Sequence, residues 1–184
     1  MPVPVLTLSI HPDRKGIAAR SIRLAMHMGD DWQPDEHINT APRKLDAQER
    51  ERFLAEPRVG ILSVAADEGR PPLTVPTWFD YRPGGTLSVI TRAGQRKSRL
   101  IRAAGAVSFS VQQPEVPYKY VTVEGTVIAQ DRAGRDALVA IGSRYLPAEE
   151  VDGWADWEVS GGNRGRYPEH VEIRIDRWIT RDFS

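Results

Sequence analysis

The side chains best suited to chemistry are the cations at the start of one predicted helix. Residues 86–92 alternate as a strand does, Gly94 supplies a turn, and a helical pattern begins at Gln95. Arg96 and Lys97 would stand in the first turn of that helix, where the macrodipole is already positive and cations are unfavourable. An anion bound by the free N–H groups and these cations would remove the conflict, and phosphate is the commonest such ligand. A solvated basic helix face would have the same composition, so both interpretations stay open.

A second candidate is Pro76, which lies in the middle of a predicted strand over residues 73–81. Proline has no N–H to give to a ladder, so this position belongs to an edge strand or to an unpaired stretch. Main-chain groups at residues 76–79 could therefore face a ligand, and a planar heterocycle with amide-like edges would suit them. Proline also protects an edge strand against aggregation. The residues alone favour neither interpretation.

The composition excludes several classes of function. Twenty-five basic and 25 acidic side chains cancel, which argues against nucleic acid or a membrane surface as a partner. The chain has no cysteine, hence no disulfide, thiolate metal site or cysteine nucleophile, and we expect a cytoplasmic protein. Phosphate-loop, nucleophile-elbow and zinc-protease motifs are all absent, and the histidine spacing matches no metal-ligand pattern. We therefore assign no catalytic side chain and no metal ligand.

The pattern of predicted helices and strands divides the chain into two regions. An arm is expected over residues 1–41, with a short helix at 17–28, followed by one domain over residues 42–184. Six strands with short connections and only peripheral helices favour an antiparallel barrel over a doubly wound parallel sheet. The expected strands span residues 58–65, 73–81, 86–92, 106–111, 118–128 and 170–179.

Five segments of the chain, in this order and spacing, resemble the pyridoxamine 5′-phosphate oxidase-like superfamily. They are residues 58–64, 73–79, 88–100, 106–111 and 118–127. The resemblance covers residues 45–130 well, the last third loosely and the first forty residues not at all. It implies a mainly β (α+β) fold, a six-stranded antiparallel split β-barrel of the FMN-binding type with peripheral helices. It also implies a homodimer with two cofactor sites at the subunit interface.

The resemblance further implies which residues bind the cofactor. In such proteins the strand–turn–helix motif contacts the cofactor phosphate, a ring of the isoalloxazine type lies along the strand that carries the proline, and the 118–120 segment lies near the dimer interface. By strand alternation Tyr118 and Tyr120 share a face. The implied cofactor-binding residues are Thr74, Pro76, Thr77, Trp78, Thr91, Arg96, Lys97, Tyr118 and Tyr120.

The chain is most similar to the flavin/deazaflavin oxidoreductase branch, whose members use coenzyme F420 or FMN. Residues 172–178 depart from the C-terminal pattern of genuine pyridoxamine phosphate oxidases, so vitamin B6 chemistry is not expected. The expectation is an F420-dependent oxidoreductase, with FMN as the alternative cofactor, in which the cofactor transfers hydride to a small molecule. A non-catalytic binding or carrier protein for a flavin, haem or tetrapyrrole on the same barrel is the alternative.

Overall fold

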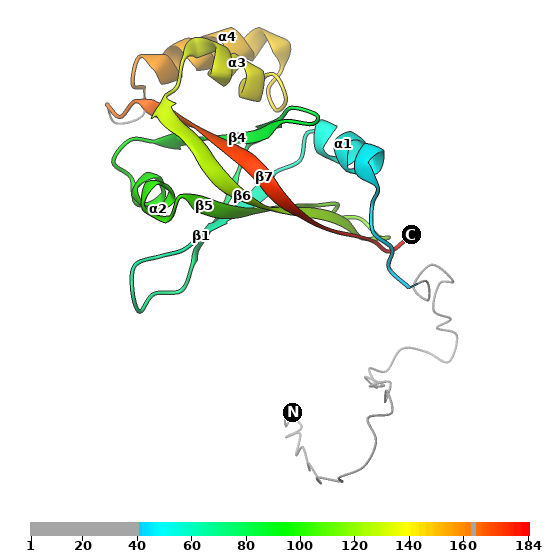
Figure 1. The fold of residues 1–184 in the computed structure, drawn as a ribbon. Helices are drawn as coiled ribbons and strands as arrows, with labels where there is room; N and C mark the ends of the chain where they lie inside the picture. Colours follow the sequence, from blue (N-terminus) through cyan, green and yellow to red (C-terminus); the bar gives the residue numbers. More distant parts are fainter. Residues whose placement is uncertain (1–40, 163–164) are drawn as a thin grey trace, which may run out of the picture. The chain divides into compact units, whose positions relative to one another are not determined.

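The computed structural model describes residues 41–162 and 165–184, so nearly all of the predicted arm over residues 1–41, with its helix at 17–28, lies outside the described residues. The described chain forms one antiparallel sheet whose strand order is β2-β1-β5-β6-β7-β4-β3 (Figure 1). The strands are β1 (Gly60–Val64), β2 (Leu73–Thr77), β3 (Phe79–Tyr81), β4 (Thr86–Arg92), β5 (Ala106–Gln112), β6 (Lys119–Arg132) and β7 (Pro168–Asp182). The helices are α1 (Ala47–Ala55), α2 (Arg96–Ala104), α3 (Arg135–Gly142) and α4 (Ala148–Val159).

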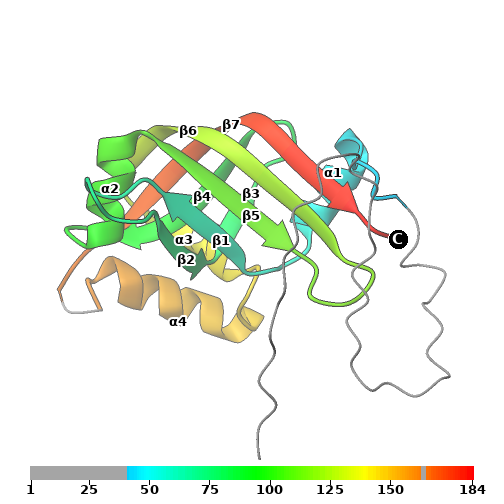
Figure 2. The same ribbon diagram turned by 90° about the horizontal axis from the view of Figure 1, so that it is seen from below.

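The sheet has seven strands in the described residues where the sequence predicts six, because the strand expected over 73–81 is two strands. The break falls at Trp78, between β2 and β3. These consecutive strands lie at the two opposite ends of the strand order. The chain therefore crosses from one edge of the sheet to the other at Trp78, and the sheet has to curl to allow it (Figure 2). Pro76 lies on the edge strand β2, as its missing N–H predicts.

The core fills the concave side of the curled sheet. Alternate residues of β1, β5 and β6 point inward, so that Leu62, Phe109 and Val123 are almost fully buried. Phe79 is also fully buried and packs edge-on against Phe109, with ring centroids 5.2 Å apart. Of the adjacent aromatic residues 78 and 79, Phe79 therefore belongs to the core. Trp78 is the half-buried one.

The helices lie around the sheet (Figure 1). The spacing of Asp46 and Glu49 in the sequence predicts a capping box at the start of α1, and the structure contains it. Asp46 Oδ1 accepts from the Glu49 N–H and Glu49 Oε2 from the Asp46 N–H, both at 2.8 Å. The basic helix α2 lies at the opposite end of the molecule from α1 (Figures 1 and 2). The α3–α4 hairpin connects β6 to β7. No helix in the described part of the chain is long and apolar enough to cross a membrane.

Candidate functional site: a basic turn and an outer sheet face

The predicted strand–turn–helix forms where the sequence places it, between β4 and α2. Gly94 adopts a φ of 71°, a left-handed conformation that favours glycine, and the helix begins at Arg96. Gln95 is the N-cap residue, and its side chain makes no capping hydrogen bond. Because the first N–H groups of a helix have no acceptor within the helix, the start of α2 can donate to an outside ligand. We refer to residues 91–97 as the basic turn.

Two cations that flank the basic turn are neutralised by buried carboxylates. Arg92, at the end of β4, forms a bidentate pair with Glu158 of α4, with both N–O distances at 2.5 Å. Arg102, in the last turn of α2, donates to Glu169 of β7 at 2.9 Å. Both carboxylates are about 95% buried. These two arginines are therefore engaged in holding α4 and α2 against the barrel.

The cations inside the basic turn are not paired in this way. Two buried guanidinium nitrogens of Arg96, Nε and Nη2, have no hydrogen-bond partner among the described residues. The exposed carboxylate of Asp67 lies 4.0 Å from Arg96 Nε, at the limit of an ion pair. Lys97 Nζ has one long hydrogen bond, 3.4 Å to the Ile90 carbonyl. Thr91 is 2% exposed, and its Oγ1 is likewise without a partner in the described chain.

The surroundings of Lys97 disfavour its positive charge. Burial of the ammonium group lowers its pKa, and the nearby positive charge of Arg92 lowers it further. A buried donor without an acceptor costs about 1–3 kcal/mol, and more for a charged group. A phosphate group that reached Thr91, Arg96 and Lys97 together would satisfy the unpaired donors and offset the positive charge. The residues of the basic turn thus fit a phosphate-bearing group.

The cavity that borders the basic turn does not include its unpaired donors. This cavity, about 600 Å³ in volume, is lined by Gly94 of the turn together with Ser98 and Arg102 of α2. Thr91, Arg96 and Lys97 line none of the four most prominent cavities in the described part of the chain. The unpaired donors of the basic turn therefore lie outside these cavities.

Three further residues that were predicted to bind the cofactor, Thr74, Pro76 and Tyr120, lie on the convex side of the sheet. We call this side the outer face. Their register places them in neighbouring rows that run across β2, β1, β5, β6 and β7. The first row is Pro76, Ile61, Ser110, Thr122 and Ile179. The second row is Thr74, Ser63, Ser108, Glu124 and Arg177, and Tyr120 stands in the third, between Gln112 and Arg181.

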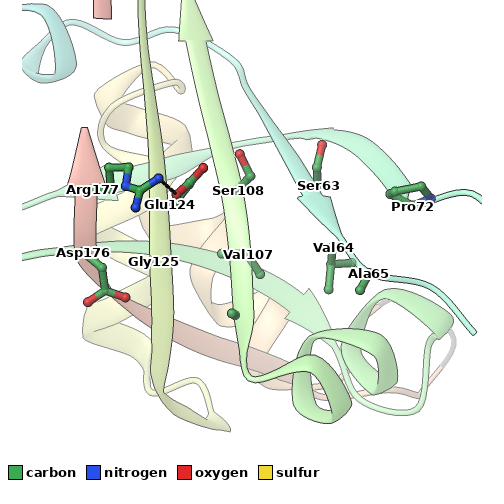
Figure 3. A pocket seen from close by; sticks show the side chains of 11 residues that line it. Ser63, Val64, Ala65, Pro72, Val107, Ser108, Glu124, Gly125, Asp176 and Arg177 are labelled. Carbon is green, nitrogen blue, oxygen red and sulfur yellow. Dashed lines mark ion pairs between the residues drawn. The ribbon is translucent and has the colours of Figure 1, made fainter. Parts of the chain in front are cut away.

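The middle of the outer face is made of small hydroxyl side chains. Ser63 Oγ and Thr74 Oγ1 lie 3.0 Å apart, and Thr122 Oγ1 donates to Ser110 Oγ at 2.8 Å. Figure 3 shows four members of the second row, Ser63, Ser108, Glu124 and Arg177, and the row ends in the ion pair between Glu124 and Arg177, at 3.5 Å. A cavity of about 570 Å³ opens along this row. The outer face can therefore form hydrogen bonds while carrying little net charge.

The remaining predicted residues have other surroundings. Trp78 stacks on Tyr145, with ring centroids 4.9 Å apart and planes 6° apart, and leans against Trp154 of α4. Its ring therefore packs on the α3–α4 hairpin. Thr77 is half-buried, and its Oγ1 donates to the Trp78 carbonyl at 3.3 Å. Tyr118 precedes β6 and is 55% exposed.

The partners of the basic turn escaped sequence analysis. Glu158 and Glu169 lie 66 and 67 residues from the arginines they bind, and nothing local marks either carboxylate as buried. Ser98 is the one partner in this group that neighbouring residues could have identified. It precedes Leu100 and Ile101 on the face of α2 that is buried, where a serine needs a hydrogen-bond partner. Ala104, which the helical pattern groups with that face, is exposed.

Comparison with known proteins gives the fold. No family model and no curated protein matches the sequence. Among solved structures, an F420 reductase is 25% identical, with a TM-score of 0.53 over 70% of this chain and 94% of that one. An FAD-binding protein from Mesorhizobium loti is 24% identical, with a TM-score of 0.53 over 79% and 100%. A conserved hypothetical protein from Mycobacterium tuberculosis is 19% identical, with a TM-score of 0.61 over 78% and 91%.

The chain therefore has the split β-barrel fold of the pyridoxamine 5′-phosphate oxidase-like proteins. The expected fold class is confirmed, with seven strands in place of six. Solved proteins of this fold include an F420 reductase, an FAD-binding protein and a haem storage protein from Vibrio cholerae. The fold is thus shared by oxidoreductases and by proteins named for binding alone.

Proposed function

We propose that this protein is an F420-dependent oxidoreductase, with FMN as the alternative cofactor, acting on a small molecule. The observation that carries the proposal is the set of unpaired donors in the basic turn, namely Thr91 Oγ1 and Arg96 Nε and Nη2, beside the weakly bonded Lys97. Both cofactors present a phosphate to which such donors can bind. The similarity to an F420 reductase and to an FAD-binding protein supports the same class of ligand.

The bound cofactor supplies the hydride chemistry, and the protein supplies position, charge and shielding from water. Arg96 and Lys97 give charge-assisted hydrogen bonds to the phosphate, and Thr91 adds a neutral one. The N–H groups at the start of α2 complete the donor set. Thr74 and Pro76 lie on the exposed edge strand β2, where a planar ring can approach the main chain.

Retention of cofactor by the purified protein tests this proposal. The protein is incubated with F420 or FMN and desalted, and its absorption spectrum is recorded. The retained cofactor is then reduced and challenged with a panel of enones and tetrapyrroles, and its reoxidation is followed. We expect one of the two cofactors to be retained and hydride to be transferred. Retention without transfer to any acceptor would favour the carrier alternative, and retention of neither cofactor would contradict the proposal.

We also propose that a second copy of the chain covers the outer face and completes the cofactor site. Ile61 and Ile179 are each 37% exposed there, on either side of the hydroxyl-rich middle. A self-complementary surface of this kind, apolar with neutral hydrogen-bonding groups, suits a two-fold contact. Thr91, Arg96 and Lys97 line none of the prominent cavities of one described chain, which also favours a site built from two subunits.

An Ile61→Arg variant is expected to be a monomer at concentrations where the wild-type protein is a dimer. The substitution places a charge in the middle of the proposed interface, where it would be desolvated without a partner. Sedimentation velocity gives the oligomeric state directly. Ile128→Arg is the matched control, because Ile128 is also an exposed isoleucine of the sheet but belongs to none of the three rows of the outer face. A monomeric wild-type protein, or a dimer that survives Ile61→Arg, would contradict the proposal.

A further inference from the structure

Glu169 is a buried acidic residue that would not itself contact a bound phosphate. It lies in β7 and is 5% exposed. In the ladder between β4 and β7 it stands directly opposite Thr91. Because paired residues of neighbouring strands project from the same face, the side chains of Thr91 and Glu169 both extend toward α2. A carboxylate so close to a proposed phosphate contact would repel the anion unless its charge were offset.

The contacts of Glu169 both offset its charge and attach it to the helix. Oε1 accepts from Arg102 Nη2 at 2.9 Å. Oε2 accepts from Ser98 Oγ at 2.5 Å and from Gln130 Nε2 at 3.2 Å. Gln130 Nε2 also reaches the carbonyl oxygen of Ser98 at 3.1 Å. One carboxylate of the barrel therefore binds α2 in its first turn, at Ser98, and in its last, at Arg102.

We propose that Glu169 is a positioning residue of the phosphate site, acting through Ser98 on the first turn of α2. This inference rests on the proposed function. Ser98 directly follows Lys97 in the chain, so fixing Ser98 also restrains the backbone of the first helical turn, from which the side chains of Arg96 and Lys97 project. The position of the donors on α2 relative to Thr91 on β4 is then set by one side chain that lies beside Thr91 and is bonded to Ser98.

A phosphate-free analogue separates positioning from general support of the fold. For the cofactor that the wild-type protein retains, dissociation constants are measured for the intact compound and for the same ring system without phosphate (riboflavin for FMN, the corresponding deazariboflavin for F420). The variants are Ser98→Ala, which deletes the hydroxyl, and Glu169→Gln, which deletes the charge. We expect each to weaken binding of the phosphate compound about tenfold, the effect of losing one hydrogen bond to a charged group, and to leave the analogue unchanged.

Ser98→Thr is the matched control, since it keeps the hydroxyl and should keep wild-type affinity. A Ser98→Ala protein that binds both compounds like the wild type, or that loses affinity for both equally, would overturn the positioning role. Should Glu169→Gln fail to fold, Ser98→Ala decides alone, because it removes one oxygen and leaves the carboxylate paired with Arg102. A wild-type protein that binds the two compounds with equal affinity would instead overturn the phosphate site, and with it the proposed function.

Discussion

An Arg96→Ala/Lys97→Ala double variant is expected to fold like the wild type and to lose the cofactor. Each cation would give the phosphate a charge-assisted hydrogen bond worth roughly 1.5–3 kcal/mol. Loss of one such bond weakens binding about 10- to 100-fold, so loss of both should weaken it about 100- to 10,000-fold if the effects add. Titration of the protein with FMN or F420, followed by fluorescence, measures the dissociation constant.

The fold should tolerate the double variant because neither side chain holds the barrel together. The buried nitrogens of Arg96 have no partner in the described chain, so their removal leaves no acceptor unsatisfied. Lys97 gives up only its 3.4 Å bond to a carbonyl, and the unfavourable burial of its charge is relieved. Thermal unfolding followed by circular dichroism should therefore show a melting temperature no lower than that of the wild type.

Arg99→Ala is the control for charge. Arg99 lies on the same helix and is exposed, with its guanidinium bonded to the carbonyl of Gly94 at 2.7 Å, outside the unpaired set. Its loss changes the net charge of α2 as either single substitution does, yet should change affinity by less than about threefold, the range of exposed charge effects. Equal losses in Arg99→Ala and in the double variant would show that cofactor binding depends on net charge alone. Full affinity in the double variant would refute the phosphate site.

The fold was largely predictable because the local signals agree with one another. Strand alternation, the capping box at Asp46 and the glycine turn at Gly94 each describe a few neighbouring residues, and the structure confirms all three. The break at Trp78 was not predictable. Residues 73–81 keep one alternating pattern throughout, while the choice of partner strand changes from β1 to β4 at the break. Which strand pairs with residues 73–81 depends on how the whole sheet curls, and the sequence of these nine residues does not contain that information.

The candidate site was also predictable only in its local features. The conflict between a helix dipole and its cations is local, so Arg96 and Lys97 could be identified from the sequence. The sequence did not reveal that Arg92 is paired while Arg96 is not. That distinction depends on Glu158, which α4 brings back to the barrel from far along the chain. Sequence analysis therefore recognised a basic segment, and the structure showed which of its cations remain available.

The same folding that pairs Arg92 and Arg102 also makes the segment suitable for binding one anion. Five cations between residues 92 and 102 would repel one another if all were free. Burial of Glu158 and Glu169 against the two outer arginines removes that repulsion at the ends and fixes both ends of the segment. The positive charge left in the middle is confined to one turn, beside Thr91. If the proposed anion site forms, the stability of the fold and the binding of the anion would depend on the same two carboxylates.

A Phe109→Ala variant is expected to lose about 3–5 kcal/mol of stability, the range for deleting a buried aromatic ring. Phe109 is 1% exposed and packs edge-on against Phe79. It also fills the space above Gly60, where an added Cβ would lie 2.1 Å from Phe109 Cζ. Because Gly60 and Phe79 belong to β1 and β3, on different sides of the strand order, loss of this ring leaves a cavity between distant strands that cannot easily collapse.

Urea unfolding followed by tryptophan fluorescence, at one fixed protein concentration, measures this loss. Domains are typically stable by about 5–15 kcal/mol, so the variant should unfold at a much lower urea concentration or fail to fold at 37 °C. Ser108→Ala is the matched control, since Ser108 is the adjacent residue of β5 and points to the outer face. Because this is a substitution on the surface of the sheet, it should change the free energy of unfolding by no more than about 0.5 kcal/mol. A loss below about 1 kcal/mol in Phe109→Ala would contradict the packing described for the centre of the barrel.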